Sequence, residues 1–249
     1  MMKSDFGKLG QSFLNFFRQL LIAHWRSLLL LFIGVYLPLQ IFGLLAVKVW
    51  ESEGGFPWDE PILVAIHQSS RAQLDVFAAK LTLAGSSRTV IPIVSVIGLG
   101  FLLKRRWRTL TYILTAALGS IIINRTTKEF MHRIRPHLWE SPSPELNFSF
   151  PSGHAMTSMT LVAALVILTW GSVWCWLILI VGSLYVLAIG WTRLYLGVHF
   201  PSDILAGWMV SVAWAIGVSL IIKPHLTQSG VITEAPPVEE TTLLRQETE

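Results

Sequence analysis

Polar residues of the kinds that handle phosphate stand in three clusters in the second half of the chain, each beside an apolar run. The clusters are Lys128 with Arg135-Pro136, then Pro151-Ser152-Gly153-His154, and then the segment from Arg193 through His199 to Asp203. Arginine offers a planar fork of donors that matches phosphate oxygens, and lysine adds a compact positive charge. Histidine supplies a nucleophile or a proton donor near neutral pH. Together these residue types predict a phosphoryl-transfer site that needs no metal.

The first cluster combines Lys128, His132 and Arg135 at spacings of i, i+4 and i+7. A helix that continued from the preceding apolar segment would align these side chains on one face. Pro136 would then end or bend that helix. The spacing predicts a cationic surface that binds phosphate, and the alternative is a group of bases that only meets lipid headgroups at a membrane surface.

The second cluster lies in a turn shaped by Pro151 and Gly153, just before an apolar run. This position places Ser152 and the backbone N–H groups after it near a helix amino terminus, where an anion is favoured. His154 is then a candidate general acid. The alternatives are a capping turn with an interfacial histidine, and a serine hydrolase, which is disfavoured because Ser152 lies outside any Gly-x-Ser-x-Gly motif.

The third cluster pairs His199 with Asp203, four residues later. Pro201 suits the first turn of a helix, so His199 would stand just ahead of a helix amino terminus. Asp203 would accept a hydrogen bond from one imidazole nitrogen and aim the other nitrogen. Such an imidazole can attack phosphorus, whereas the alternative is a helix-capping or interfacial polar pair.

The composition is that of a membrane protein. Of the 249 residues, 53% are hydrophobic and only 14% are charged, and the mean hydropathy is +0.58. The net charge is +4, but the bases cluster beside apolar runs rather than in a basic domain, so nucleic acid is not expected as a partner. The single cysteine, Cys175, excludes an intramolecular disulfide and a cysteine-based metal site.

Apolar segments predict an all-α integral membrane bundle with six crossings, each needing about 20 residues. The 38 uncharged residues from Ala155 to Thr192 would form roughly 57 Å of helix, so they must hold two crossings with a break at Trp170-Gly171-Ser172-Val173-Trp174. The six segments are Ser27 to Val47, Leu81 to Leu103 with Arg88 snorkelling, Thr109 to Asn124, the two within Ala155 to Thr192, and Ile204 to Ile222.

An even number of crossings puts both termini on one side and the three polar clusters together on the other. The connection from Lys104 to Arg108 is rich in bases, as is the amino-terminal segment, so the positive-inside rule assigns both to the cytoplasm. We therefore expect a plasma-membrane protein whose termini are cytoplasmic and whose polar clusters lie at the extracytoplasmic face.

Two further segments complete the predicted organisation. Between the first two crossings, Ile62, Leu63 and Ile66 would form the apolar stripe of a short interfacial helix. Residues 223–249 are rich in glutamate and contain Pro236-Pro237, a composition typical of a disordered tail, which would be cytoplasmic. Residues 1–222 would then form the membrane catalytic domain.

The three clusters together resemble the signature of the type 2 phosphatidic acid phosphatase (PAP2) superfamily. These are membrane lipid phosphatases related to bacterial phosphatidylglycerophosphatase B and undecaprenyl-diphosphatase. The resemblance rests on Lys128-x6-Arg135-Pro136, Pro151-Ser152-Gly153-His154 and Arg193-x5-His199-x3-Asp203, which span about a third of the chain. Thr192 stands where the family often has serine, and it keeps the hydroxyl group.

The resemblance implies a role for each matching residue. His199 would be the nucleophile that becomes a phosphohistidine, Asp203 would orient it, and His154 would protonate the leaving group. Phosphate oxygens would be held, and transition-state charge stabilised, by Lys128, Arg135, Arg193, Ser152 and the Gly153 backbone. No metal and no other cofactor is implied, because the three cations supply the electrostatic stabilisation.

The implied activity is that of a metal-independent lipid phosphate phosphatase. The substrate would be phosphatidate, phosphatidylglycerophosphate or an isoprenyl diphosphate, with its tail in the bilayer. A lipid phosphotransferase that uses the same phosphohistidine is the main alternative. A transporter or channel and a metal-dependent hydrolase are weaker ones. The sequence specifies neither the particular lipid nor the oligomeric state.

Overall fold

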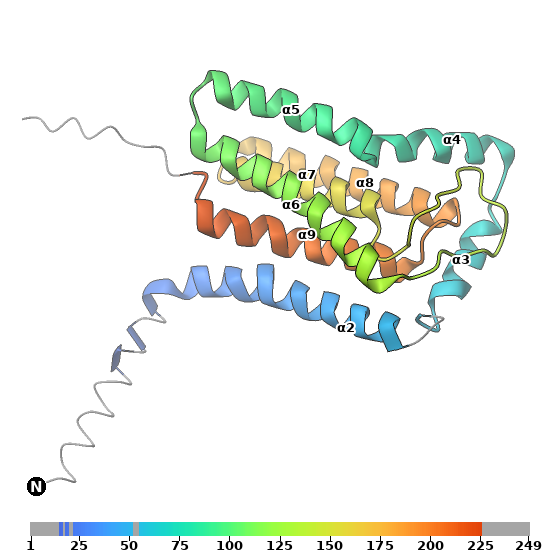
Figure 1. The fold of residues 1–249 in the computed structure, drawn as a ribbon. Coiled ribbons are helices and arrows are strands. Elements are labelled where there is room, and N and C mark those ends of the chain that lie inside the picture. The colour runs from blue at the N-terminus through green and yellow to red at the C-terminus, as the bar shows by residue number, and fades with distance from the viewer. Residues whose placement is uncertain (1–14, 17, 20–21, 52–54, 226–249) are drawn as a thin grey trace, which may run out of the picture.

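The computed structural model describes residues 15–16, 18–19, 22–51 and 55–225, and every regular element in these residues is helical (Figure 1). The predicted all-α class is therefore confirmed. Residues 22–31 are helical, and the elements that follow are the π-helix η1 (Phe32–Tyr36), α2 (Leu37–Glu51), α3 (Asp59–His67), α4 (Ala72–Thr82), the 3-10 helix η2 (Leu83–Gly85), α5 (Ser87–Leu103), α6 (Trp107–Met131), α7 (Gly153–Leu168), α8 (Val173–Tyr195) and α9 (Pro201–Ile222).

Four helical stretches in the described part of the chain are long and apolar enough to cross a membrane. They are Ile22–Glu51, Ala72–Leu103, Val173–Tyr195 and Pro201–Ile222. Helix α7 is apolar but shorter, and the 25-residue α6 contains the predicted third crossing without being one of the four. The chain is an integral membrane protein, while the count of six crossings stays a prediction.

The break predicted inside the long uncharged run is present. Helix α7 ends at Leu168 and α8 begins at Val173, and Gly171 occupies the turn with φ of +84°. Trp170 and Trp174 on either side of this turn are exposed. Their position fits that of aromatic side chains at a membrane–water boundary.

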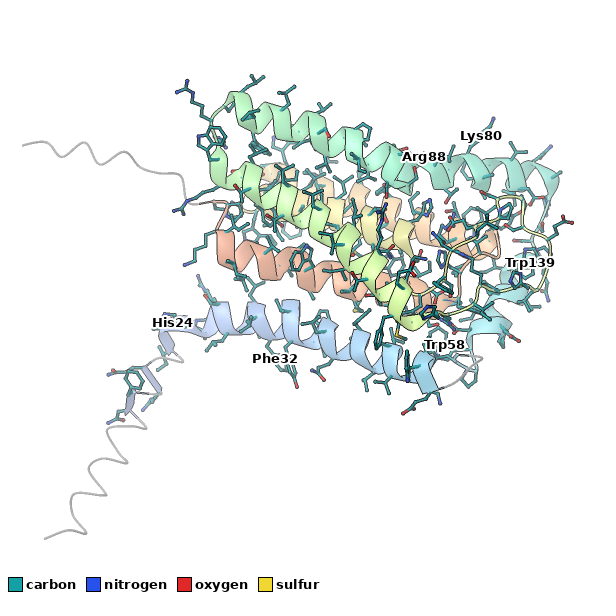
Figure 2. The ribbon with its side chains drawn as sticks, viewed as in Figure 1. His24, Phe32, Trp58, Lys80, Arg88 and Trp139 are labelled. Atoms are coloured by element: carbon teal, nitrogen blue, oxygen red, sulfur yellow. The ribbon has the colours of Figure 1, made fainter. Side chains whose placement is uncertain are left out.

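The start predicted for the second crossing is too late in the chain. Its helical stretch starts at Ala72 rather than at Leu81, because α4, η2 and α5 follow one another with little interruption. Polar residues in α4 do not stop the helix, since Asp75 accepts a hydrogen bond from the Tyr195 hydroxyl at 2.7 Å. Arg88, expected to snorkel, is an exposed residue of the first turn of α5 (Figure 2).

Helix α6 ends earlier than the sequence predicts. Its last residue is Met131, and His132 adopts a left-handed conformation with φ of 49° while its N–H donates to the Lys128 carbonyl. The prediction that Lys128, His132 and Arg135 share one helical face is therefore wrong. Lys128 alone lies on α6, His132 is exposed, and Arg135 belongs to the loop of residues 132–152.

Helix α9 lies at the centre of the bundle and packs against α7, α2 and α6. At Gly207 the approach of α7 is so close that an added Cβ would lie 3.0 Å from the Ser152 carbonyl oxygen. An apolar cluster of Leu45, Val49, Phe150 and Ala206 joins α2 to the same region. The close contact of α7 with α9 places the second polar cluster beside the first turn of α9.

The polar clusters gather at one end of the bundle. Figure 1 shows α3, the loop between α6 and α7, and the connection between α8 and α9 at this end. The connection between α5 and α6 and the last turn of α9 lie at the opposite end. The two connections that carry the polar clusters are therefore neighbours in space.

The connection between α2 and α4 contains the predicted short helix, α3. Leu63 is fully buried and Ile66 packs against the cluster of Ala78, Tyr195, Leu196 and Val198, whereas Ile62 is exposed. Two of the three stripe residues thus face protein, and the interfacial position of α3 stays a prediction. Of the predicted tail, residues 226–249 lie outside the described residues.

Candidate active site

Arg135 joins the first polar cluster to the third. Its Nη1 atom lies 2.5 Å from the Val198 carbonyl oxygen and 3.0 Å from His199 Nε2, and its Nε donates to the Asn147 carbonyl at 2.6 Å. The side chain is buried, and it reaches this position from the loop that follows α6. The 132–152 loop is therefore anchored directly to the turn that carries His199.

His199 is completely buried, immediately ahead of α9, which begins at Pro201. Its Nδ1 lies 3.2 Å from Asp203 Oδ2, and the same oxygen accepts a hydrogen bond of 2.9 Å from the Phe200 N–H. Asp203 is held in this position by the first turn of α9. With Nδ1–H donated to Asp203, the lone pair of Nε2 faces Arg135.

The surroundings of His199 keep its imidazole neutral. Burial lowers the pKa of His199 well below its ordinary value of 6.5, and the positive charges of Arg135, Lys128 and Arg193 lower it further. A neutral imidazole with a free Nε2 lone pair is a nucleophile, whereas a protonated one is not. The geometry and the charge state of His199 therefore both suit a nucleophile.

Three buried cations form a cradle, which is the name used below for Lys128, Arg135 and Arg193. The exposed fractions of these three residues are 6%, 8% and 1%, in that order. Lys128 donates to the Phe148 carbonyl, and Arg193 donates to the Thr82 hydroxyl at 2.8 Å. Buried positive charges require a negative partner, because desolvation is otherwise too costly.

Glu145 supplies that negative partner. Its Oε2 lies 2.7 Å from Arg135 Nη2, its Oε1 pairs with Arg193, and His154 Nδ1 is 3.7 Å from Oε1. Burial raises the pKa of the Glu145 carboxyl, but Arg193 and Arg135 outweigh burial and hold it below its usual value. Two of the three cradle cations thus bind an oxyanion, here the Glu145 carboxylate of the 132–152 loop.

The second cluster contributes to the site in two ways. Ser152 is buried at the amino terminus of α7, where its Oγ accepts a hydrogen bond of 3.5 Å from the Ala155 N–H, and its own N–H donates to the Asp203 carbonyl at 3.1 Å. Gly153 begins α7. The Ser152 hydroxyl therefore caps the helix, while the partly exposed His154 faces the carboxylate in the cradle.

A cavity of about 620 Å³ opens beside the cradle. Its polar lining includes Lys128, Glu145 and His154, and its apolar lining includes Ile91 and Ile121. A second, smaller and largely apolar cavity runs between α5, α6 and α7 and shares with the first the residues Ser87, Ile91, Ser120, Ile121 and Thr157. The site therefore has a charged end and an adjoining apolar end.

Sequence reasoning brought together six residues that the structure also places at this end: Lys128, Arg135, His154, Arg193, His199 and Asp203. It missed Glu145, and also Arg133 and Asp59, whose buried side chains form an ion pair beside Asp203. Nothing around Glu145 marks it, because it sits in a polar loop without periodicity. Arg133 precedes Arg135 by two residues, and in an extended chain residues at this spacing have side chains on the same face. The spacing could therefore have indicated that Arg133 lies near the site.

Among residues 22–51 and 55–225, no group of three or more His, Cys, Asp or Glu side chains is arranged to hold a metal ion. The chemical groups that are present are a neutral imidazole paired with a carboxylate, a second imidazole, and three buried cations, two of which bind a carboxylate. Groups of these kinds are chemically suited to nucleophilic phosphoryl transfer.

The chain is similar to several known proteins. The model of the PAP2 superfamily matches residues 108–225. The chain is 25% identical over 205 residues to an undecaprenyl-diphosphatase of Sulfolobus acidocaldarius, a match that covers 80% of this chain and 91% of that protein. It is 28% identical over 160 residues to phosphatidylglycerophosphatase B of Bacillus subtilis, which covers 62% of this chain and 78% of that protein.

The fold has a counterpart among solved structures. The crystal structure of a transmembrane PAP2 type phosphatidylglycerolphosphate phosphatase from Bacillus subtilis superimposes with a TM-score of 0.68. That match is 24% identical in sequence and covers 78% of this chain and 100% of the other. Residues 108–225 of this chain therefore form a domain of the PAP2 superfamily, and the chain is a phosphoric ester hydrolase.

Proposed function

We propose that this chain is a metal-independent lipid phosphatase that removes a phosphate from a membrane lipid through a phosphohistidine at His199. The observation that carries the proposal is the direction of His199 Nε2, which faces Arg135 inside the cradle while Nδ1 is fixed by Asp203. A phosphate bound by the same cations in place of the Glu145 carboxylate would present its phosphorus to that nitrogen.

The first step is the transfer of the phosphoryl group to His199. Nε2 forms a bond to phosphorus while the bond from phosphorus to the lipid oxygen breaks. Lys128, Arg135 and Arg193 stabilise the charge on the equatorial oxygens. The negative charge of the bound phosphate favours the protonated form of His154, which faces the oxyanion position and gives its proton to the departing lipid oxygen. The products are the dephosphorylated lipid and the phosphoenzyme.

The second step is hydrolysis of the phosphoenzyme. His154 has lost its proton in the first step, so it takes a proton from a water molecule as that water attacks phosphorus. The bond from phosphorus to Nε2 breaks, and His199 returns to its neutral form. One water is consumed and one inorganic phosphate is released, so protons and charge balance over the cycle.

A lipid substrate fits the shape of the site. The charged cavity adjoins an apolar one between α5, α6 and α7, so a phosphorylated headgroup and an apolar tail have separate places. Similar proteins are named for undecaprenyl diphosphate and phosphatidylglycerophosphate. We propose phosphatidate, phosphatidylglycerophosphate and isoprenyl diphosphates as the substrate class, with the lipid tail remaining in the bilayer.

We propose that six helical segments cross the plasma membrane. The site would lie at the extracytoplasmic face, both termini would be cytoplasmic, and α3 would lie at the interface. The positions of the two ends support this: the site and α3 lie at one end of the bundle, and the basic connection from Lys104 to Arg108 lies at the other (Figure 1). Residues 1–222 would form the catalytic domain, and 223–249 a disordered tail.

The test is release of inorganic phosphate by the purified full chain from the three lipid classes, with and without a chelator, in water enriched in ¹⁸O. We expect turnover that chelator does not change and one ¹⁸O atom in each phosphate released. His199→Ala should abolish turnover. Loss of activity with chelator and its return with a divalent metal would contradict the metal-independent mechanism, and transfer of phosphate to a second lipid would identify a phosphotransferase.

A further inference from the structure

A chain of three buried charged side chains lies behind His199. Arg133 Nη1 is 2.5 Å from Asp203 Oδ1, and Arg133 Nη2 is 2.8 Å from Asp59 Oδ2. The side chain of Arg133 is 6% exposed and both carboxylates are 0% exposed. The three residues come from the 132–152 loop, α9 and α3, so the contact joins elements far apart in sequence.

Asp59 is tied to the first turn of α9 as well as to Arg133. Its Oδ1 accepts the Ser202 N–H at 3.0 Å, and its Oδ2 accepts the Ser202 hydroxyl at 2.6 Å and the Phe56 N–H at 3.2 Å. Ser202 is the neighbour of Asp203. Asp59 therefore fixes both the guanidinium that holds Asp203 and the backbone that carries it.

Arg133 has little freedom to move. Its guanidinium lies 4.2 Å from the centre of the Phe200 ring, and it also donates to the Ser202 hydroxyl at 2.8 Å. On the other side, a Cβ added to Gly55 would lie 2.1 Å from Arg133 Nη2. A planar group confined in this way is pre-organised, so little entropy is lost when it orients its partners.

The two oxygens of Asp203 are thus assigned different partners. Oδ1 binds Arg133, while Oδ2 accepts the Phe200 N–H and faces His199 Nδ1. Rotation of the carboxylate would break the contact with Arg133 and leave buried charges without partners, which is costly. Arg133 therefore holds the carboxylate in the one orientation that receives the imidazole N–H.

Charge balance gives Asp59 a second effect. Two carboxylates share one guanidinium, so with both carboxylates ionised the group as a whole carries a formal net charge of −1 beside the imidazole. Positive charge develops on the imidazole as Nε2 bonds phosphorus, and a nearby negative charge stabilises it. Without Asp59, the charge of Arg133 would be directed at Asp203 alone and would offset that stabilisation.

We propose that Asp59 and Arg133 are positioning residues of the phosphoryl-transfer reaction, which act by holding Asp203 so that His199 Nε2 faces the phosphate. The inference rests on the proposed function, because it assigns these residues to the His199 nucleophile. Neither residue lines the cradle, and each acts on the reaction through Asp203.

The test compares Asp59→Asn, Arg133→Gln and Arg133→Lys with the wild type in purified full-length protein. We expect kcat to fall roughly 10- to 100-fold or more in Asp59→Asn and Arg133→Gln, as for loss of partners that orient a catalytic group, with KM changed little. Arg133→Lys should recover part of the activity, because it keeps the charge. The affinity of vanadate, which probes the cradle, should stay within about threefold of wild type.

The matched control is Asp75→Asn. Asp75 is also an acid at this end of the bundle, and it bonds Tyr195 rather than Arg133. We expect it to keep wild-type kcat. The inference is overturned if Asp59→Asn keeps wild-type kcat, or if it lowers kcat, vanadate affinity and Tm together, since that pattern indicates a purely structural role. His199→Ala separates the two ideas: an active His199→Ala variant defeats the proposed function itself.

Discussion

The carboxylate of Glu145 occupies the place where a phosphate would bind. Its two oxygens are shared between Arg135 and Arg193, with His154 nearby. In the proposed mechanism a substrate phosphate must displace it, so Glu145 would compete with every anion that binds the cradle. The competition is electrostatic and depends on the negative charge of the side chain rather than on its size.

We therefore predict that Glu145→Gln, which removes the charge, lowers the concentration of inorganic phosphate or vanadate that inhibits turnover by about tenfold. Hydrogen bonds to charged groups contribute about 1.5–3 kcal/mol, and about 1.4 kcal/mol corresponds to tenfold. Inhibition curves of the purified protein measure this. Glu140→Gln, an exposed acid of the same loop, is the control. Equal inhibition of wild type and Glu145→Gln would show that the carboxylate does not compete with phosphate.

The lowered pKa of His199 predicts the pH profile. The imidazole is neutral and active above its pKa. We therefore expect kcat/KM to stay constant at pH values below 6.5, the ordinary pKa of histidine, and to decline only as the pH falls through the lowered pKa. Lys128→Gln removes one of the charges that lower this pKa, so its acid limb should move up toward 6.5. The substrate's own ionisation is common to both proteins. An identical acid limb in both would contradict the assignment of that limb to His199.

The motif spacing predicted which candidate catalytic side chains meet, because His199 and Asp203 are fixed by a local helix start. The cradle cations lie on neighbouring segments: Lys128 near the end of α6, Arg193 near the end of α8 and Arg135 on the 132–152 loop. It could not predict Glu145 or Asp59. Glu145 comes from an irregular loop, and Asp59 is brought to Arg133 by tertiary packing of α3 against α9. Contacts of this kind leave no periodic pattern in the sequence.

At the scale of elements, the turn between α8 and α9 sets the position of His199. Gly197 in this turn has φ of +66°, and a Cβ there would lie 2.6 Å from the Trp139 ring. Trp139 in turn stacks on His67 of α3, with ring centres 3.9 Å apart, at the end of the bundle shown in Figure 2. The 132–152 loop, α3 and the turn between α8 and α9 are thus packed against one another.

We predict that Gly197→Ala lowers both the Tm and the activity. The left-handed conformation alone costs an alanine about 1–2 kcal/mol, and the clash with Trp139 adds to it by displacing the turn. Gly171→Ala is the matched control, because Gly171 has φ of +84° with no atom within 4 Å of an added Cβ. Thermal unfolding and turnover of both variants measure the difference. Equal loss in both would show that the Trp139 contact does not position the turn.

The helix boundaries were predictable where the length of an apolar run or a proline determines them. The break between α7 and α8 and the start of α9 at Pro201 follow from the length of the apolar run and the fixed φ of proline. The end of α6 could not be predicted, because His132 adopts a left-handed conformation that is not expected from its residue type. The start of the second crossing at α4 could not be predicted from apolar residues alone. A helix can extend beyond its apolar part when its polar side chains have hydrogen-bond partners in the fold.

For the whole molecule, the central question is which end faces the cytoplasm. The single cysteine allows a direct test, since Cys175→Ala gives a background without thiols. We predict that a cysteine at Leu146, an exposed residue of the 132–152 loop, reacts with an impermeant maleimide in intact cells. A cysteine at Arg105 should react only after the membrane is permeabilised. The reverse pattern would place the site in the cytoplasm.

The most direct test of the mechanism is a search for the phosphoenzyme. The purified protein is mixed with a lipid labelled with ³²P in its terminal phosphate and quenched in alkali within the first turnovers, and the labelled peptide is then sequenced by mass spectrometry. We predict an alkali-stable and acid-labile phosphate on His199, formed as fast as the first turnover and absent from His199→Ala. Full turnover with no label on His199, or a label on Ser152 or His154 instead, would contradict the account.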